Sequence, residues 1–66
     1  MSEVTDETRN KWDERIAFLF LHSEHTDDWE TEFVDSMELI RSRGQDLTLR
    51  QSFKLGKIFH KVEEKV

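Results

Sequence analysis

With 66 residues, a net charge of −5 and no cysteine, the chain has room for one small domain and excludes disulfides and thiolate metal ligands. Its longest apolar run, Ile16 to Leu21, is far shorter than the roughly 20 residues needed to cross a bilayer, and its acidic start, MSEVTDETRN, is unlike a secretory or transit peptide. We therefore expect a cytoplasmic protein without membrane contact.

The first expected element is a helix over about residues 5–23. Four apolar residues recur at i, i+4, i+7 and i+8, which is one side of a helix: Trp12, Ile16, Leu19 and Phe20. Three more widen this stripe, so we expect cover on more than one side: Ala17, Phe18 and Leu21. The same run also suits a short buried strand, but the sequence offers no second strand-like run to pair with it.

The second expected helix covers about residues 28–43. Asp27, followed three residues later by Glu30, is a capping-box pattern. Gly44 follows the last turn, where a left-handed residue commonly ends a helix. The apolar stripe, which we expect to face the core, has spacings of four, four and three: Trp29, Phe33, Met37 and Ile40.

The third expected helix covers about residues 49–64 and begins with a second capping-box pattern, Thr48 with Gln51. Gly56 lies inside it at a cost of roughly 1 kcal/mol relative to alanine. A close helix crossing is our preferred explanation, and plain tolerance is the alternative. The expected core residues have Phe53 and Leu49 near one edge and are Leu55, Ile58, Phe59 and Val62.

Three amphipathic helices with short connections predict an all-α fold, with residues 1–66 forming a single domain. The economical arrangement is a small three-helix bundle whose apolar stripes face a common core. At this size an oligomer built from helical hairpins is a competing arrangement, so monomer and homodimer both stay open.

Residues suited to catalysis or metal binding are few. His22 and His25 could share a metal ion with a nearby carboxylate, but we favour surface histidines and predict no metal site. The serines lie in no glycine-rich elbow, and the chain has no phosphate-binding or dinucleotide-binding motif. We therefore predict that the protein is not an enzyme and uses no cofactor.

Charge is segregated along the chain. Residues 1–40 hold three basic and twelve acidic side chains, a net charge of −9, whereas residues 41–66 hold seven basic and three acidic, a net charge of +4. Five basic residues recur at spacings of four, three, four and four, and we call them the basic ridge: Arg50, Lys54, Lys57, Lys61 and Lys65. Such a ridge could contact nucleic-acid phosphates, or its members could simply solubilise an exposed helix face.

The acidic half also has two interpretations. Its carboxylates could form an ordinary solvated helix face, or a surface complementary to a basic protein, including one that mimics nucleic acid. The candidate acidic surface consists of Asp27, Asp28, Glu30 and Asp35.

The segment WETEFVDSMELIRSRGQDLTLRQSFKLGKIFHKV resembles a short helical element of phage and mobile-element proteins of DNA metabolism. That element has an aromatic helix, a glycine turn and a second capped helix. The matching residues are Trp29, Phe33, Ser36, Gly44, Leu47, Thr48, Gln51, Leu55 and Ile58. The resemblance covers about half the chain and implies an accessory module found with helicases, nucleases or recombination proteins. It implies no catalytic residue, and the acidic first helix is not part of it.

Our leading hypothesis is a non-catalytic helical binding module, phage-encoded and accessory to DNA processing, whose basic ridge contacts nucleic acid or an acidic partner. The alternative is an acidic inhibitor or adaptor that binds a basic host protein through its first two helices.

Overall fold

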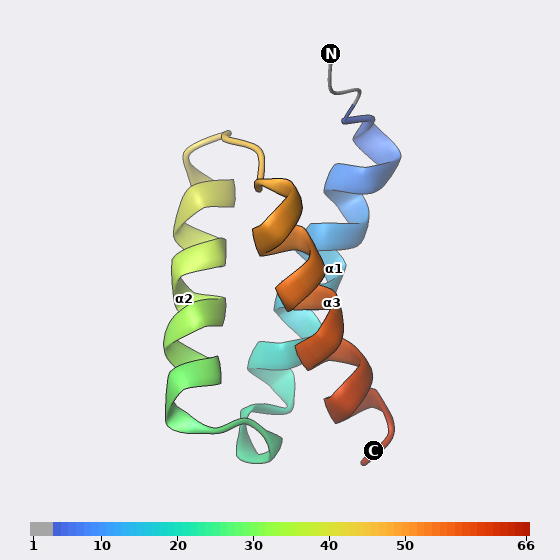
Figure 1. Cartoon of the computed structure of the whole chain (residues 1–66), viewed down its shortest axis with the longest axis vertical. Coiled ribbons are helices and arrows are strands. Elements are labelled where there is room, and N and C mark those ends of the chain that lie inside the picture. The colour runs from blue at the N-terminus through green and yellow to red at the C-terminus, as the bar shows by residue number, and fades with distance from the viewer. Residues whose placement is uncertain (1–3) are drawn as a thin grey trace.

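In the computed structural model, which describes residues 4–66, the chain forms a bundle of three α-helices with one short 3-10 turn (Figure 1). The chain turns back after α1, runs antiparallel to it through α2, and turns again so that α3 lies parallel to α1. This confirms the predicted three-helix bundle. The elements are α1 (Asp6–Leu21), the turn η1 (Ser23–His25), α2 (Asp28–Ser42) and α3 (Leu49–Glu63).

The helix ends follow the local signals in the sequence. At α3 the backbone N–H of Thr48 donates to Gln51 Oε1 at 2.9 Å, and the Gln51 N–H donates to Thr48 Oγ1 at 3.1 Å. At α2 the N–H of Asp27 donates to Glu30 Oε1 at 2.9 Å. Gly44 has a φ of +76°, as its place after α2 requires. Both predicted capping boxes are confirmed, and the predicted bounds are correct to within two residues.

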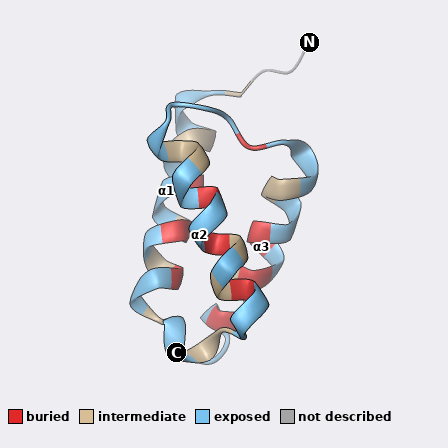
Figure 2. Ribbon diagram, turned by 90° about the vertical axis from the view of Figure 1, so that its left-hand side faces the viewer, coloured by how far each residue is buried: buried red, intermediate tan, exposed pale blue. Residues whose placement is uncertain are grey.

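The core lies along the bundle axis, where the inward sides of the three helices meet (Figure 2). Trp12 of α1 is also hydrogen-bonded to α3, because its Nε1 donates to Ser52 Oγ at 2.9 Å. Leu47, in the connection between α2 and α3, closes one end. The buried apolar side chains are Trp12, Ile16, Leu19, Val34, Met37, Leu47, Leu55, Ile58 and Val62.

The predicted stripe of α1 was too wide. Ala17, Phe20 and Leu21 are exposed, so the expectation that these side chains are covered is wrong for residues 4–66 taken alone. Phe18 is half-buried and meets Phe59 of α3 edge to face, with 5.0 Å between ring centroids. The described chain therefore covers α1 on little more than one side.

In α2 the buried side is turned by one position from the predicted stripe. Glu30, Val34 and Met37 point inward, whereas Trp29, expected in the core, is 54% exposed. Phe33 is half-buried, as is Ile40, which packs against the core. The prediction for Trp29 is wrong because Glu30 is neutralised by an ion pair and can occupy the inward position.

In α3 the predicted core side is correct for Leu55, Ile58 and Val62. Phe59 is only half-buried, and both residues that we placed near the edge, Phe53 and Leu49, are exposed. The apolar side of α3 is therefore narrower than its sequence suggests.

Gly56 is buried on the side of α3 that faces α1. A Cβ at this position would lie 3.1 Å from Arg15 Nη1, and the same guanidinium lies 5.0 Å from the Phe59 ring centroid. The absent side chain thus leaves room for an arginine rather than for a close backbone approach.

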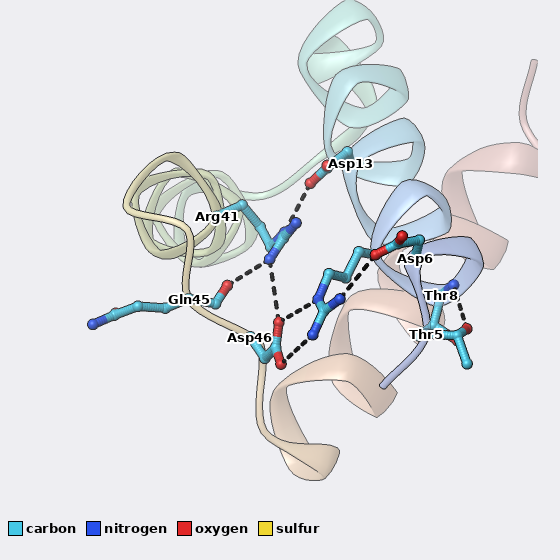
Figure 3. Close-up of polar contacts among 8 residues, drawn as sticks. Thr5, Asp6, Thr8, Asp13, Arg41, Gln45 and Asp46 are labelled. Atoms are coloured by element: carbon cyan, nitrogen blue, oxygen red, sulfur yellow. Dashed lines mark hydrogen bonds and ion pairs between the residues drawn. The ribbon is translucent and has the colours of Figure 1, made fainter. Parts of the chain in front are cut away.

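An ionic network fastens the α2–α3 connection to α1 (Figure 3). Arg9 donates to both carboxylate oxygens of Asp46, at 2.8 and 3.2 Å, and this hydrogen bonding holds the pKa of Asp46 below its ordinary value. Arg41 donates to Asp13 at 2.9 Å and to the Gln45 carbonyl at 2.6 Å. The connection is thereby held against the first half of α1.

Within residues 4–66, no helix is both long enough and apolar enough to cross a membrane.

Candidate functional site

Helices α2 and α3 contact each other less extensively than either contacts α1. A surface hollow of about 320 Å³ lies along their junction. We call the hollow and the side chains around it the α2–α3 seam. The hollow is lined by Trp29, Glu30, Lys54, Lys57, Ile58 and Lys61.

Two lysines of the seam lie over aromatic rings. Lys54 Nζ is 5.9 Å from the ring centroids of both Trp29 and Phe33, and Lys57 Nζ is 5.7 Å from that of Phe53. These are cation–π distances. Trp29 is 54% exposed and Phe53 is 69% exposed, so large parts of both side chains stay accessible to a ligand.

Lys61 has a different environment. Its Nζ donates to both carboxylate oxygens of Glu30, at 2.7 and 2.6 Å, and Glu30 Oε1 also accepts the N–H of Asp27. Glu30 is only 4% exposed. Burial by itself would raise the pKa of Glu30, but the hydrogen bonds from Lys61 and Asp27 and the positive charges of Lys61 and Lys65 outweigh it and lower the pKa. Glu30 is therefore a buried, charged carboxylate.

The ion pair between Lys61 and Glu30 sets Lys61 apart from the other residues of the basic ridge. Lys61 is engaged with a buried partner, whereas Arg50, Lys54, Lys57 and Lys65 are exposed and make no ion pair with any carboxylate of residues 4–66. Four of the five residues lie on α3, whereas Lys65 lies two residues beyond its end. The four without an ion pair have charges available to a ligand.

The predicted acidic surface loses Glu30. Glu30 is buried in the seam, and Asp27 caps α2 with its carboxylate 3.8 Å from Lys61. Asp28 and Asp35 are exposed. The interpretation of Glu30 as a contact residue is wrong, because its carboxylate is enclosed by its own chain.

The exposed aromatic residues of the seam were missed from sequence. A signal for Trp29 existed: Glu30, Val34 and Met37 fall at i, i+4 and i+7, which turns Trp29 away from the core if Glu30 finds a cation. Phe53 lies two residues before Leu55, about 200° around the helix from the buried side. Both signals were hidden by the usual expectation that aromatic residues are core residues.

The histidines do not form a metal centre in the described chain. The rings of His22 and His25 are 6.5 Å apart, and His60 lies beside Glu63. Among residues 4–66, no three potential metal ligands come together.

Chemically, the seam combines accessible cations with exposed aromatic rings, an arrangement suited to binding groups that are both anionic and planar. No protein-family model matches this chain, and neither a curated protein nor a solved structure matches it.

Proposed function

We propose that the protein is a non-catalytic binding module of a phage or mobile element, accessory to DNA processing, that contacts nucleic-acid phosphates with α3. The observation that carries the proposal is a set of exposed cations on α3 and just beyond its end that have no carboxylate partner within residues 4–66: Arg50, Lys54, Lys57 and Lys65. Phosphate contacts by such side chains supply most of the non-specific affinity of nucleic-acid-binding proteins. The resemblance of residues 29–62 to phage DNA-metabolism modules supports the same function.

The net charge of −5 does not oppose this proposal, because the charges are separated in space. Salt screens charges beyond roughly 10 Å at 0.1 M ionic strength, so a phosphate responds to the nearest side chains. Trp29 and Phe33, which meet Lys54, mark the flank of α2 that faces α3. At 100° per residue, Asp28, Glu32 and Asp35 fall on the outer side of α2 instead. The carboxylate that lines the hollow, Glu30, is neutralised by Lys61, and the exposed carboxylate of Asp27 lies 3.8 Å from the same ammonium.

The test is a titration of labelled single-stranded and duplex DNA at about 20 mM and about 150 mM salt, since phosphate contacts weaken steeply with salt. We expect binding at low salt that falls as salt rises, and weaker binding with a smaller salt dependence for the double variant Lys54→Gln, Lys57→Gln. Lys11→Gln, which removes an exposed lysine of α1, is the matched control and should bind like the parent. Absence of binding to either DNA at the lower salt would contradict the proposal.

The outer side of α2 supports a second proposal, an adaptor or inhibitor that binds a basic protein. Asp28, Glu32 and Asp35 are exposed there together with Leu39, which supplies an apolar contact among acidic side chains. A partner captured from host lysate should be lost with the double variant Asp28→Lys, Asp35→Lys. Glu30 is left unchanged because it serves folding. A complex that is indifferent to these reversals would contradict this second proposal.

A further inference from the structure

We propose that the ligand of the α2–α3 seam is single-stranded nucleic acid, with bases stacked on Trp29 and Phe53 and phosphates held by Lys54 and Lys57. This inference rests on the proposed function and names its substrate class. It starts from the two exposed rings, which the phosphate contacts alone do not explain.

The two rings contribute little to the core. Trp29 and Phe53 are more than half exposed, and the core is formed by other side chains. Each ring has a lysine ammonium within 6 Å of its centroid: Lys54 over Trp29 and Lys57 over Phe53. Lys54 and Lys57 are three residues apart on α3 and both line the hollow, so the two pairs of ring and cation are neighbours along the helix. Aromatic side chains interleaved with cations are the means by which proteins bind single strands without reading sequence.

The hollow beside the Trp29 ring suits a single strand. Its inner wall includes Ile58, which is buried and apolar, and its rim carries Lys54 and Lys57. Glu30 lies within the hollow, but Lys61 holds its carboxylate at 2.6 Å, so a phosphate nearby meets a neutralised pair. A base edge can therefore enter the hollow while the phosphates remain at the cationic rim.

A duplex fits this surface poorly. Its bases are stacked on one another, so their faces are not available to Trp29 or Phe53. The major groove is about 12 Å wide, which is close to the diameter of a single α-helix with its side chains. Because α3 packs against both other helices, its entry into that groove would bring the outer carboxylates of α2, including Asp28 and Asp35, toward the phosphates. A narrow single strand along the seam avoids this repulsion.

The experiment compares the affinity of the full chain for a labelled oligo(dT) of about 12 nucleotides, a duplex of equal length and polyglutamate, all at one low salt concentration. We expect the single strand to bind most tightly. Trp29→Leu and Phe53→Leu keep an apolar side chain but remove the ring, and each should weaken single-strand binding by about 5- to 150-fold. Duplex binding should change less than about twofold, because phosphate contacts alone carry it.

Matched variants separate stacking from folding. Trp29→Phe and Phe53→Tyr keep a ring and should retain most of the affinity. Phe20→Leu removes another aromatic ring, 41% exposed, from a hollow that also contains Asp13 and Glu38, and it should bind like the parent. Circular dichroism checks whether each variant is folded. If one leucine variant unfolds, the other still decides the result, because each ring is tested independently.

The outcomes also separate this inference from the proposed function. Equal binding of single strand and duplex, with no loss in the leucine variants, would overturn the stacking inference and leave phosphate binding by α3 standing. Tighter binding of the duplex than of the single strand would also overturn the stacking inference and leave phosphate binding by α3 standing. Tighter binding of polyglutamate than of oligo(dT) would assign the seam to an acidic protein and overturn the inference. Absence of binding to both nucleic acids would overturn the inference and the proposed function together.

Discussion

Helices α2 and α3 both have 15 residues but bury different kinds of residue. Every buried position of α3 is apolar or glycine, whereas α2 buries Glu30 and exposes its neighbour Trp29. The buried Glu30 and the exposed Trp29 each contact a different lysine of α3. Lys61 holds the Glu30 carboxylate at 2.6 Å, and Lys54 lies over the Trp29 ring. The comparison teaches that the side of α2 that faces inward depends on cations carried by α3.

The difference has an energetic basis. A carboxylate buried without a partner is costly, whereas one that is paired and hydrogen-bonded is tolerated. Glu30 receives two hydrogen bonds from Lys61 and one from the Asp27 backbone, so its burial is compensated. Part of the Lys61 side chain stays exposed, which lets the ammonium keep some of its hydration.

The apolar side of α3 should give the largest effect on stability. Leu55 is fully buried, so Leu55→Ala should lower the free energy of unfolding by about 2–5 kcal/mol, through lost transfer energy and the cavity left behind. Leu49→Ala, at an exposed position of the same helix, should change it by less than about 0.5 kcal/mol. Urea denaturation measures both. Similar losses in the two variants would show that α3 does not direct Leu55 into the core.

Removal of Lys61 should give the next largest effect, and it tests whether this ridge residue serves the interior. Lys61→Gln leaves the Glu30 carboxylate without its cation and should cost about 1–3 kcal/mol. Lys57→Gln, on the same ridge, should cost less than about 0.5 kcal/mol. In a double-mutant cycle with Glu30→Gln, the losses should be non-additive. Additive losses would mean that the two side chains do not interact.

Acid should weaken the same pair. The folded-state pKa of Glu30 lies below its ordinary value of 4.5, so the charged carboxylate stabilises the folded chain above that value. This stability is lost as the pH falls through the lowered folded-state pKa. The free energy of unfolding should therefore decrease more between pH 6 and about pH 3 in the parent than in Glu30→Gln. Asp46, whose pKa is also lowered, adds to the acid sensitivity, and Asp46→Asn measures its share. An identical pH profile for the parent and Glu30→Gln would contradict the assignment.

Gly56 should give the smallest effect. Alanine favours a helix interior over glycine by up to about 1 kcal/mol, but the added Cβ would lie 3.1 Å from Arg15 Nη1. Because that atom ends a flexible side chain, it can move, and we expect Gly56→Ala to stabilise the fold by about 0.5 kcal/mol. In an Arg15→Ala background the gain should approach the full propensity difference. Thermal unfolding of the parent, the two single variants and the double variant measures these changes in stability. If Gly56→Ala lowers the stability both with and without Arg15, the added Cβ is crowded by an atom other than Arg15 Nη1.

The helices and their ends could be predicted because their determinants are local. Thr48 with Gln51, Asp27 with Glu30, and Gly44 each act within a few residues of the boundary they define. The burial of Glu30 and the exposure of Trp29 could not be predicted from such local signals. Both depend on Lys61, which lies 31 residues from Glu30 in the sequence, and a periodicity of hydrophobic residues contains no such pairing.

For the candidate site, too, the sequence predicts the positions that follow from helical spacing but not the contacts between helices. The spacing of the basic residues placed Arg50, Lys54, Lys57 and Lys61 on one side of α3, because helical periodicity alone decides that, whereas Lys65 lies beyond the end of the helix. The spacing could not show that Lys61 is engaged while Lys54 and Lys57 remain available. Nor could it place exposed rings beside them, because ring exposure depends on how closely α2 packs against α3.

The hydrogen bond between the Trp12 and Ser52 side chains has a consequence for how the chain folds. It joins residues 40 positions apart, and Arg9 and Asp46, which also bridge the first helix to a later segment, are 37 apart. The first helix thus gains its contacts with α3 and with the α2–α3 connection only after nearly the whole chain has been ordered. Such distant contacts favour a single cooperative transition over a stable two-helix intermediate. In hydrogen-exchange measurements, the central amides of α1 and α3 should open together, at the free energy of global unfolding.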